Sequence, residues 1–293
     1  MISPIEHMVK PDDLIESQRL FHGRGHAYPG LEHVNIDWIA PAIIVTLYSE
    51  VERDWLEAVC ADLQVLLPEC ENLQVQYRCR PRGPFEAMAG GEVDQLVAVE
   101  NGLKYHISLG RAQNTGLFLD IANGRSWVKN NSEGKNVLNL FSYTCAFSVA
   151  ALAGGAQRVV NIDMAKGALS TGRENHRVND HDMTRVIFQG IDIFKSWSRI
   201  KKYGPYDILI SDPPSFQKGS VDIQRDYYKL ISRIPQLVKP GGMLMMCLNS
   251  PDLDDDFLKQ QMEEYCPDCQ LIGKIENPKV FKEAQQGKGL KVY

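Results

Sequence analysis

The stretch Asn136–Ser148, NVLNLFSYTCAFS, decides the fold. It begins with the apolar run Val137–Phe141, which suits a strand buried on both faces of a parallel sheet. A small polar turn, Ser142–Thr144, follows, and an apolar segment with helical spacing then runs from Ala146 to Ala153. A strand, a tight turn and a helix open a doubly wound α/β domain, in which ligands bind where the strands end.

The turn after this strand lacks the glycine patterns of phosphate-binding loops. Neither G-x-G-x-x-G nor G-K-[ST] occurs here, so the dinucleotide and P-loop fingerprints are absent. The next predicted strand, Arg158–Ile162, is followed by Asp163. A carboxylate at the end of the second strand can accept hydrogen bonds from both ribose hydroxyls. We therefore expect a nucleoside without phosphates as the ligand, and S-adenosylmethionine is such a molecule.

Composition limits the class of protein. The 293 residues, 44% of them hydrophobic, can bury a large core, and the length suggests about two domains. A formal net charge of −5 gives no global basic signature for nucleic acid, although a local basic patch remains compatible with it. No apolar run reaches the roughly 18–20 residues of a membrane span, and the N-terminus has no secretory signal. We expect no membrane association.

The seven cysteines are scattered and odd in number. Without an export signal, this usage predicts a reduced, cytoplasmic protein. Cys266 and Cys269 form a C-x-x-C pair, but no second pair has the spacing of a zinc site. We therefore expect no metal.

Two domains are predicted, a small N-terminal α/β domain over residues 1–109 and a cofactor-binding domain over residues 110–293. The small domain is expected to recognise the substrate. Its predicted elements are strands at 42–48 and 73–77, a helix at 51–67, a loop at 78–91 with the basic residues Arg78, Arg80 and Arg82, and a hairpin of 95–100 and 104–109 over the turn dipeptide Asn101-Gly102.

From residue 110 onward the pattern alternates between strands and helices, which implies a mainly parallel sheet with right-handed crossovers. The tail, 271–293, is expected to add edge strands. The predicted strands are 136–141, 158–162, 185–189, 206–211 and 243–248, and the predicted helices are 146–153, 166–178, 192–200, 223–238 and 254–265.

The most specific motif is Ser211–Phe216, SDPPSF, directly after an apolar strand. Adjacent prolines cannot continue a strand, so they predict a rigid loop at the carboxyl end of the sheet. Such a loop would fix Asp212 beside the cofactor crevice and leave Phe216 to stack on a planar base. An ordinary turn after a strand is the alternative interpretation.

A second carboxylate, Asp192, follows the third strand of this region. It can accept a hydrogen bond from the exocyclic amine of adenine, while Ile193 or Phe194 packs on the ring. Asp192 can equally cap the N-terminus of a helix, and the two roles are compatible.

Residues 110–293 resemble the class I S-adenosylmethionine-dependent methyltransferases, and within that class the bacterial 23S ribosomal RNA base methyltransferases. The resemblance implies a doubly wound, mainly parallel, seven-stranded Rossmann-like methyltransferase sheet beside the small N-terminal α/β domain. The motifs that carry it are Gln113–Asp120, Asn139–Thr144, Asp163-Met164, Asp212–Phe216 and Val221–Tyr227, with Arg19–Gly23 and Tyr28–Leu31 in the small domain.

The resemblance also assigns residues to the cofactor. Thr115–Asp120 would close over it, and Asp212 would border it. The remaining positions are Asn139, Phe141, Tyr143 and Thr144 at the methionine end, Asp163 and Met164 at the ribose, and Asp192 and Ile193 at the adenine.

Two departures from the family pattern stand out. The cytosine-C5 members usually carry an extra N-terminal RNA-binding domain, which is not evident here. They also usually have Gly where this chain has Cys145. Glycine lets a backbone approach a ligand closely, so Cys145 could narrow the methionine pocket. The favoured interpretation is that Cys145 is a small buried residue at the start of a helix.

The predicted strand that ends near Asn249 bears on the chemistry. Methylating cytosine at carbon 5 requires a thiolate that adds to carbon 6. Cytosine-C5 relatives have Cys where this chain has Asn249, whereas guanine-N7 relatives have Asn. Cys247 lies further back in the strand and is expected in the core. We therefore expect a ring or exocyclic nitrogen as the target, with Asp212, Pro213, Phe216 and Asn249 as catalytic residues.

Three functions stay open at this point. The favoured one is methyl transfer from S-adenosylmethionine to a base of ribosomal RNA, either free or in a pre-ribosomal particle. The second is cytosine-C5 methylation of RNA. The third is a cofactor-binding module with lost or regulatory activity, which Cys145 and the missing RNA-binding domain suggest.

Overall fold

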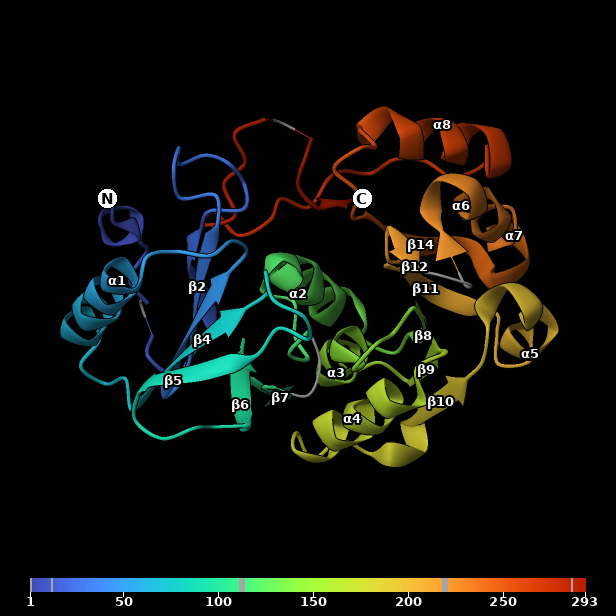
Figure 1. Cartoon of the computed structure of the whole chain (residues 1–293). Coiled ribbons are helices and arrows are strands. Elements are labelled where there is room, and N and C mark those ends of the chain that lie inside the picture. Colours follow the sequence, from blue (N-terminus) through green and yellow to red (C-terminus); the bar gives the residue numbers. More distant parts are fainter. Residues whose placement is uncertain (1, 12, 111–113, 218–220, 286) are drawn as a thin grey trace. The chain divides into compact units, whose positions relative to one another are not determined.

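In a computed structural model, described over residues 2–11, 13–110, 114–217, 221–285 and 287–293, the chain divides into two units (Figure 1). The first comprises residues 1–120 and 278–286, and the second comprises 121–277 and 287–293. Part of the C-terminal tail thus belongs to the first unit. The domain boundary expected after residue 109 stays a prediction.

A five-stranded sheet in the order β1-β2-β3-β4-β5 forms the centre of the first unit. Strands β3 and β4 pair in parallel, and the other neighbours pair antiparallel. The elements of this unit are η1 (Pro4–His7), β1 (Gln18–His22), β2 (Val34–Ile39), β3 (Ala42–Leu47), α1 (Arg53–Leu66), β4 (Asn72–Tyr77), β5 (Phe85–Ala89), β6 (Gln95–Glu100) and β7 (Leu103–Ser108).

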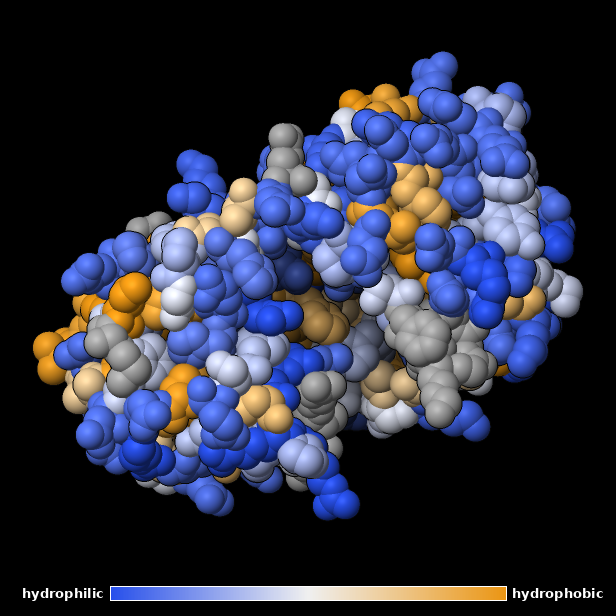
Figure 2. Space-filling view, turned by 45° about the horizontal axis from the view of Figure 1, so that its top comes forward, coloured by the Kyte–Doolittle hydropathy of each residue, from blue (hydrophilic) through white to orange (hydrophobic). Residues whose placement is uncertain are grey.

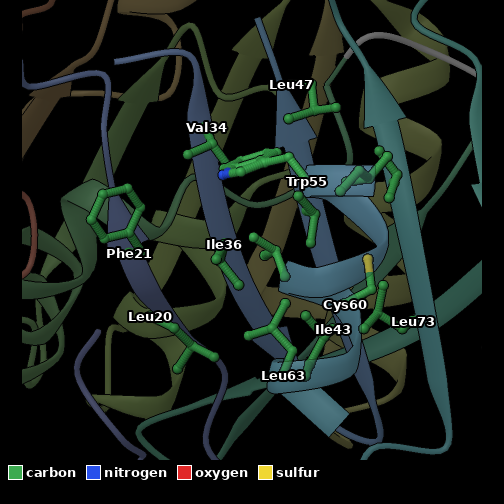
Figure 3. Packing of buried hydrophobic residues seen from close by; sticks show 14 of the residues in the cluster. Leu20, Phe21, Val34, Ile36, Ile43, Leu47, Trp55, Cys60, Leu63 and Leu73 are labelled. Atoms are coloured by element: carbon green, nitrogen blue, oxygen red, sulfur yellow. The ribbon is translucent and has the colours of Figure 1, made fainter. Parts of the chain in front are cut away.

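Helix α1 covers one face of this sheet. Trp55, Val59 and Leu63 recur on it at helical spacing, and all three are buried. Figure 3 shows Trp55 and Leu63 directed at strand residues such as Ile36. This apolar stripe is the pattern that predicts the helix from sequence, and it supplies the core of the unit.

The loop predicted over residues 78–91 is wrong in part, because Phe85–Ala89 form β5 at the edge of the sheet. All five residues of β5 are half-buried, so the strand lacks the alternation that would reveal it in the sequence. Strands β1 and β2 also went unpredicted. The hairpin of β6 and β7 is confirmed, and Asn101 and Gly102 both have the positive φ angles, 51° and 73°, that its tight turn requires.

A six-stranded sheet in the order β10-β9-β8-β11-β14-β15 forms the centre of the second unit. Its first five strands are parallel, and β15 is antiparallel. The elements, with η2 (Leu119–Ile121) at the junction, are α2 (Ala122–Asn131), β8 (Asn136–Leu140), α3 (Ala146–Ala153), β9 (Arg158–Asp163), α4 (Lys166–Arg177), η3 (Met183–Arg185), β10 (Val186–Gly190), η4 (Ile193–Lys195), α5 (Trp197–Lys201), β11 (Tyr206–Ser211), β12 (Phe216–Gln217), β13 (Val221–Asp222), α6 (Ile223–Ile231), α7 (Ile234–Leu237), β14 (Val238–Leu248), α8 (Asp255–Tyr265) and β15 (Lys291–Val292).

Helices cover both faces of this sheet, as Figure 1 shows. Val137 and Leu138 are neighbours on β8, but they belong to different hydrophobic clusters. The Val137 cluster includes residues of α2 and α3, and the Leu138 cluster includes residues of α5, α6, α7 and α8. The expected α/β fold with a mainly parallel, doubly covered sheet is therefore confirmed.

Two details of the prediction are wrong. The described residues give six strands in this sheet rather than seven, because Ile275 makes a single backbone hydrogen bond to Val292 where a further strand was expected in the tail. The helix expected over 223–238 is two helices, α6 and α7. Pro235 lies in the first turn of α7, and proline lacks the N–H that a continuous helix would need there.

Hydrophilic residues cover most of the face seen in Figure 2, with small hydrophobic patches among them. Across the described part of the chain, no helix is both long enough and apolar enough to span a membrane.

Candidate active site

The carboxyl ends of five parallel strands meet at one edge of the sheet in the second unit. The strand order changes direction between β8 and β11, so this edge holds the switch point at which such sheets bind ligands. Leu140 of β8 lies opposite Ser211 of β11 and opposite Ile162 of β9. The predicted residues at 139–144, 163–164, 192–193, 212–213 and 249 therefore all lie at or just beyond strand ends on this edge.

The loop after β8 has an unusual backbone. Phe141, Tyr143 and Cys145 have φ angles of 55°, 46° and 62°, in the left-handed region that favours glycine. Each such residue costs on the order of 1–3 kcal/mol, and this strain persists where surrounding groups hold the chain in place. Strained positions of this kind cluster at ligand sites. The loop must therefore be restrained by its neighbours.

Asp163, the last residue of β9, supplies much of that restraint. Its Oδ2 accepts a hydrogen bond from the N–H of Tyr143 at 2.8 Å, and its Oδ1 accepts one from the N–H of Ala165 at 2.7 Å. Asn175 of α4 adds a third tie, because its Nδ2 donates to the carbonyl of Thr144 at 2.9 Å. Each carboxylate oxygen has two lone pairs, so Asp163 keeps acceptor capacity for ribose hydroxyls.

A chain of buried hydrogen bonds begins at Asn139 of β8. Asn139 Nδ2 donates to Asn161 Oδ1 at 2.9 Å, and Asn161 Nδ2 donates to Ser148 Oγ at 2.9 Å. Ser148 Oγ lies 2.9 Å from His176 Nε2, and the Nδ1 atoms of His176 and His181 are 3.0 Å apart. The first four residues are at most 1% exposed. The chain thus links β8 to α4 through the interior.

Asn139 enters this chain as a donor through Nδ2, so its Oδ1 remains available as an acceptor. Ser148 Oγ accepts from Asn161, so its own proton can be donated to His176. Burial, with the neighbouring His181, lowers the pKa of His176 to about 3, so His176 is neutral and Nε2 can accept. The Oδ1 of Asn139 has no partner in the described residues. A buried carbonyl in this state costs about 1–3 kcal/mol, which fits a ligand that donates a hydrogen bond there.

Cys145 is accommodated by a glycine on α4. A Cβ atom at Gly172 would lie 2.5 Å from Cys145 Sγ and 3.0 Å from Cys145 Cβ, so the thiol occupies space that only a glycine leaves free. Cys145 is fully buried at the N-cap of α3, which confirms the favoured interpretation. Burial also raises the pKa of its thiol far above the ordinary value, so the thiol stays uncharged.

Asp192 and Ile193 follow β10 on the same edge. Asp192 Oδ1 accepts a hydrogen bond from the N–H of Phe194 at 2.9 Å, and Oδ2 lies 3.2 Å from Lys195 Nζ. The helix-capping role of Asp192 is thus confirmed. Ile193 is buried, and the rings of Phe194 and Phe141 lie 6.4 Å apart. Met164, which follows Asp163, is 46% exposed and presents an apolar surface. Contact of these residues with adenine stays a prediction.

Asp212 and Pro213 follow β11, beside the end of β8. Pro213 is buried and Asp212 is partly exposed. The side chain of Phe216 lies outside the described part of the chain, so its stacking role stays a prediction. The backbone of Phe216–Gln217 pairs with β13 in a short antiparallel ladder. The Asp-Pro-Pro motif therefore leads from the sheet edge directly into a small hairpin.

Asp226, which sequence reasoning missed, anchors this hairpin to α6. It is 3% exposed, and its Oδ2 accepts a hydrogen bond from the N–H of Asp222 at 3.0 Å. Arg225 and Lys229 both pair with it at 2.7 Å. These cations hold the pKa of Asp226 far below its ordinary value, so the carboxylate remains charged at neutral pH.

The end of β14 separates Cys247 from Asn249. Cys247 is fully buried in the hydrophobic cluster that contains Ile208 and Ile210, which confirms its predicted place in the core. Asn249 is exposed, just past the strand end. Of these two residues, Asn249 is therefore the one that a bound base can reach.

Thr115 and Asp120 belong to the first unit, and Gln113 lies outside the described residues. The carbonyl of Thr115 accepts a hydrogen bond from the N–H of Ser108 at 2.8 Å, which fixes this segment along β7. Closure of Thr115–Asp120 over a cofactor stays a prediction.

Sequence reasoning also missed the residues behind Asn139. Asn161 interrupts the apolar strand Val159–Ile162, and Ser148 lies in the apolar segment of α3. A polar residue inside a predicted buried element needs a partner, and this rule is the signal that could have found both.

The contact between residues 145 and 172 predicts that the effect of Gly172→Ala on stability has opposite signs in the wild-type and Cys145→Gly backgrounds. Gly172→Ala should gain about 1 kcal/mol of helix propensity in α4 but lose about 1–3 kcal/mol to overpacking against Cys145. In the Cys145→Gly background the clash with the thiol disappears and only a 3.3 Å approach to the Thr144 carbonyl remains, so the gain should outweigh the loss. Urea unfolding of the four proteins in this double-mutant cycle measures both effects. A Gly172→Ala effect that is the same in both backgrounds would contradict the contact.

Comparison with known proteins places the chain in a family. A model of S-adenosylmethionine-dependent methyltransferases matches residues 18–293. Ribosomal RNA large subunit methyltransferase I of Cronobacter sakazakii is 31% identical over 243 residues, which cover 80% of this chain and 61% of that protein. The protein of the same name from Erwinia tasmaniensis is 29% identical over 268 residues, which cover 88% of this chain and 67% of that protein. The matched part of the chain thus spans 61–67% of the length of these relatives.

Solved structures agree with the fold. SMU.776, described as a methyltransferase complexed with SAH, aligns with a TM-score of 0.85 and 28% identity over 95% of this chain and 74% of that one. A methyltransferase from Agrobacterium tumefaciens, at 18% identity and a TM-score of 0.67 over 85% of this chain and 78% of that one, supports the fold alone. The resemblance expected from the motifs is confirmed, and the chain belongs to the S-adenosylmethionine-dependent methyltransferase family.

Proposed function

We propose that this protein transfers a methyl group from S-adenosylmethionine to a nitrogen of a ribosomal RNA base. The observation that carries the proposal is the register of β8 and β11, in which Leu140 lies opposite Ser211. The restrained loop after β8 and the Asp212-Pro213-Pro214 loop therefore start side by side. Methyl transfer needs the donor and the acceptor atom about 3–3.5 Å apart, so two adjacent loops suit a two-substrate reaction.

The loop after β8 and its neighbours would hold the cofactor, which supplies a methyl group on a positively charged sulfur. Asp163 would accept hydrogen bonds from the ribose hydroxyls with the lone pairs that Tyr143 and Ala165 leave free. The unpartnered Oδ1 of Asn139 would accept one from the amino group at the methionine end. Asp192, Ile193 and Met164 would bound the adenine, and Phe141 and Thr144 complete the proposed set within this unit.

The proposal of an RNA substrate is supported by the relatives named ribosomal RNA large subunit methyltransferase I. Free ribosomal RNA and a pre-ribosomal particle are both candidate forms of the substrate. Asp212, with Pro213 and Phe216, would orient the base, and the exposed Asn249 would add a hydrogen bond to its edge. We propose that the small N-terminal domain recognises the RNA and that the methylation takes place in the cytoplasm.

A nitrogen target is favoured over carbon 5 of cytosine by the position of Cys247. A nucleophilic thiol must reach the base, whereas Cys247 is fully buried in the core. A ring nitrogen has its own lone pair, and an exocyclic amine needs only an acceptor for the proton it loses, so neither needs a covalent intermediate. The idea of a module with lost activity is also weakened, because Cys145 packs against Gly172.

Asp163→Ala should weaken binding of S-adenosylhomocysteine by about 10–100-fold, since charge-assisted hydrogen bonds contribute roughly 1.5–3 kcal/mol. The variant loses the tie to the loop as well as the ribose acceptor. The 2′-deoxy form of the ligand separates the two roles, because it lacks one of the hydroxyls. Calorimetry should show a smaller loss from Asp163→Ala with the deoxy ligand. Equal losses with both ligands would remove Asp163 from the ribose site.

Ser148→Ala should weaken binding of S-adenosylhomocysteine by about 5–30-fold, because Asn161 and then Asn139 lose the partner that fixes their amides. Binding of 5′-methylthioadenosine, which lacks the amino-acid end, should be unchanged. A general loosening of the fold would weaken both ligands alike, so this pair of titrations isolates the orientation of Asn139. Equal weakening of both would contradict the role of the buried chain.

The chemistry is tested with bulk ribosomal RNA from a strain that lacks this protein. The protein should methylate it, and nucleoside analysis by mass spectrometry should find the new methyl group on a ring or exocyclic nitrogen. Cys247→Ala should stay within a few-fold of wild-type turnover, whereas Asp212→Ala should lower turnover much more than cofactor affinity. A 5-methylcytidine product, together with loss of activity in Cys247→Ser, would overturn the nitrogen assignment. No methylation of the bulk RNA or of pre-ribosomal particles from the same strain would overturn the proposed function.

A further inference from the structure

Three strands of the first unit run in the same direction and end at the same edge of its sheet. Strands β1 and β3 are both antiparallel to β2, and β4 is parallel to β3. Arg24, Tyr48 and Arg78 lie just beyond the ends of β1, β3 and β4, respectively. The edge therefore gathers two arginines and a tyrosine that are far apart in the sequence.

These three side chains form one cluster. The guanidinium carbon of Arg24 lies 4.5 Å from the centre of the Tyr48 ring, and that of Arg78 lies 5.6 Å from it. Two cations over the same ring lie within about one Debye length, roughly 10 Å, of each other, so they repel. Their attraction to the ring offsets part of that repulsion, and an anion would offset more.

A buried residue holds the cluster in place. Asn35 of β2 is 3% exposed, and its Oδ1 accepts hydrogen bonds from the N–H groups of Gly23 at 3.1 Å and Arg24 at 3.4 Å. Its Nδ2 donates to the Tyr48 hydroxyl at 3.4 Å. Arg78 Nη2 in turn donates to Asn114 Oδ1 at 3.4 Å. The Asn35 side chain thus positions both the backbone of Arg24 and the Tyr48 ring beneath the Arg24 guanidinium.

The charges of the cluster are not neutralised within the described residues, where neither Arg24 nor Arg78 forms an ion pair with a carboxylate. Two other arginines of this unit, Arg80 and Arg53, are instead paired with carboxylates. Arg80, two residues from Arg78, lies 3.8 Å from the centre of the Tyr77 ring, but both its Nε and its Nη2 bind Glu50 at 2.7 Å. Arg53 pairs with Glu57 and Glu86. Arg24 and Arg78 therefore keep donors that an anionic ligand can use.

We infer that Arg24 and Arg78, held on Tyr48, bind phosphates of the RNA backbone. This inference rests on the proposed RNA substrate and names one place where the RNA is held. Planar guanidinium groups match phosphate oxygens with two parallel hydrogen bonds, and such contacts position a nucleic acid without reading its sequence. A local cluster of this kind also explains how a chain with a net charge of −5 can bind RNA.

The test is binding of a fluorescent single-stranded RNA of mixed sequence to the whole protein across a salt series. The double variant Arg24→Gln, Arg78→Gln should bind at least tenfold more weakly. The slope of log affinity against log salt should fall by about 1.4, since each phosphate contact on a single strand contributes about 0.7. The matched control, Arg80→Gln, removes an arginine of the same loop that already has a carboxylate partner, and it should change affinity less than threefold.

Each outcome is decisive. Calorimetry with S-adenosylhomocysteine should give the same affinity for all three proteins, which shows that the variants are folded. If the wild type binds RNA and the double variant binds it with the same affinity and slope, the cluster is not a phosphate site. If Arg80→Gln weakens binding as much as the double variant does, the effect is general charge and the inference also fails. If the wild type binds no RNA, this inference fails, and the proposed function is decided separately by the methylation assay.

Discussion

The Asp163 carboxylate, held between the N–H groups of Tyr143 and Ala165, is the interaction on which the site depends. The loop after β8 has three non-glycine residues in the left-handed region, and such a backbone does not persist by itself. Asp163 fixes the middle of the loop from the neighbouring strand, and Asn175 fixes its end from α4. In the proposed complex the same carboxylate also accepts hydrogen bonds from the ribose, so its structural role and its proposed binding role would share one group.

The interior behind the loop makes the site rigid in a second way. Asn139, Asn161, Ser148 and His176 replace part of an apolar core with a chain of buried hydrogen bonds. In a low-dielectric interior such a network fixes the orientation of each amide strongly, because a reversed amide would place two donors or two acceptors together. Cys145 also packs closely on Gly172 of α4. A ligand therefore meets a surface whose polar groups are already oriented.

Much of this was predictable from the sequence, because it depends on local patterns. The turn Ser142–Thr144, the carboxylate Asp163 and the Asp212-Pro213-Pro214 loop each lie at or just beyond the end of a strand that hydrophobic patterning reveals. Contacts between distant residues were not predictable. Asn139 meets Asn161 and Cys145 meets Gly172 only because β9 and α4 pack beside β8 and α3. Strand β5 was missed for a similar reason, because its half-buried residues show their role only when β4 is beside them.

Hydrogen exchange at the backbone amide of Tyr143 tests most directly whether the loop is held before any ligand binds. Because Asp163 accepts this hydrogen bond in the structure, the amide should be strongly protected in the free protein, and S-adenosylhomocysteine should add little protection. In Asp163→Ala the protection of Tyr143 should disappear, while amides in the centre of β8 stay protected. An amide that exchanges at the unprotected rate in the free protein, and is protected only with ligand, would contradict a preformed site.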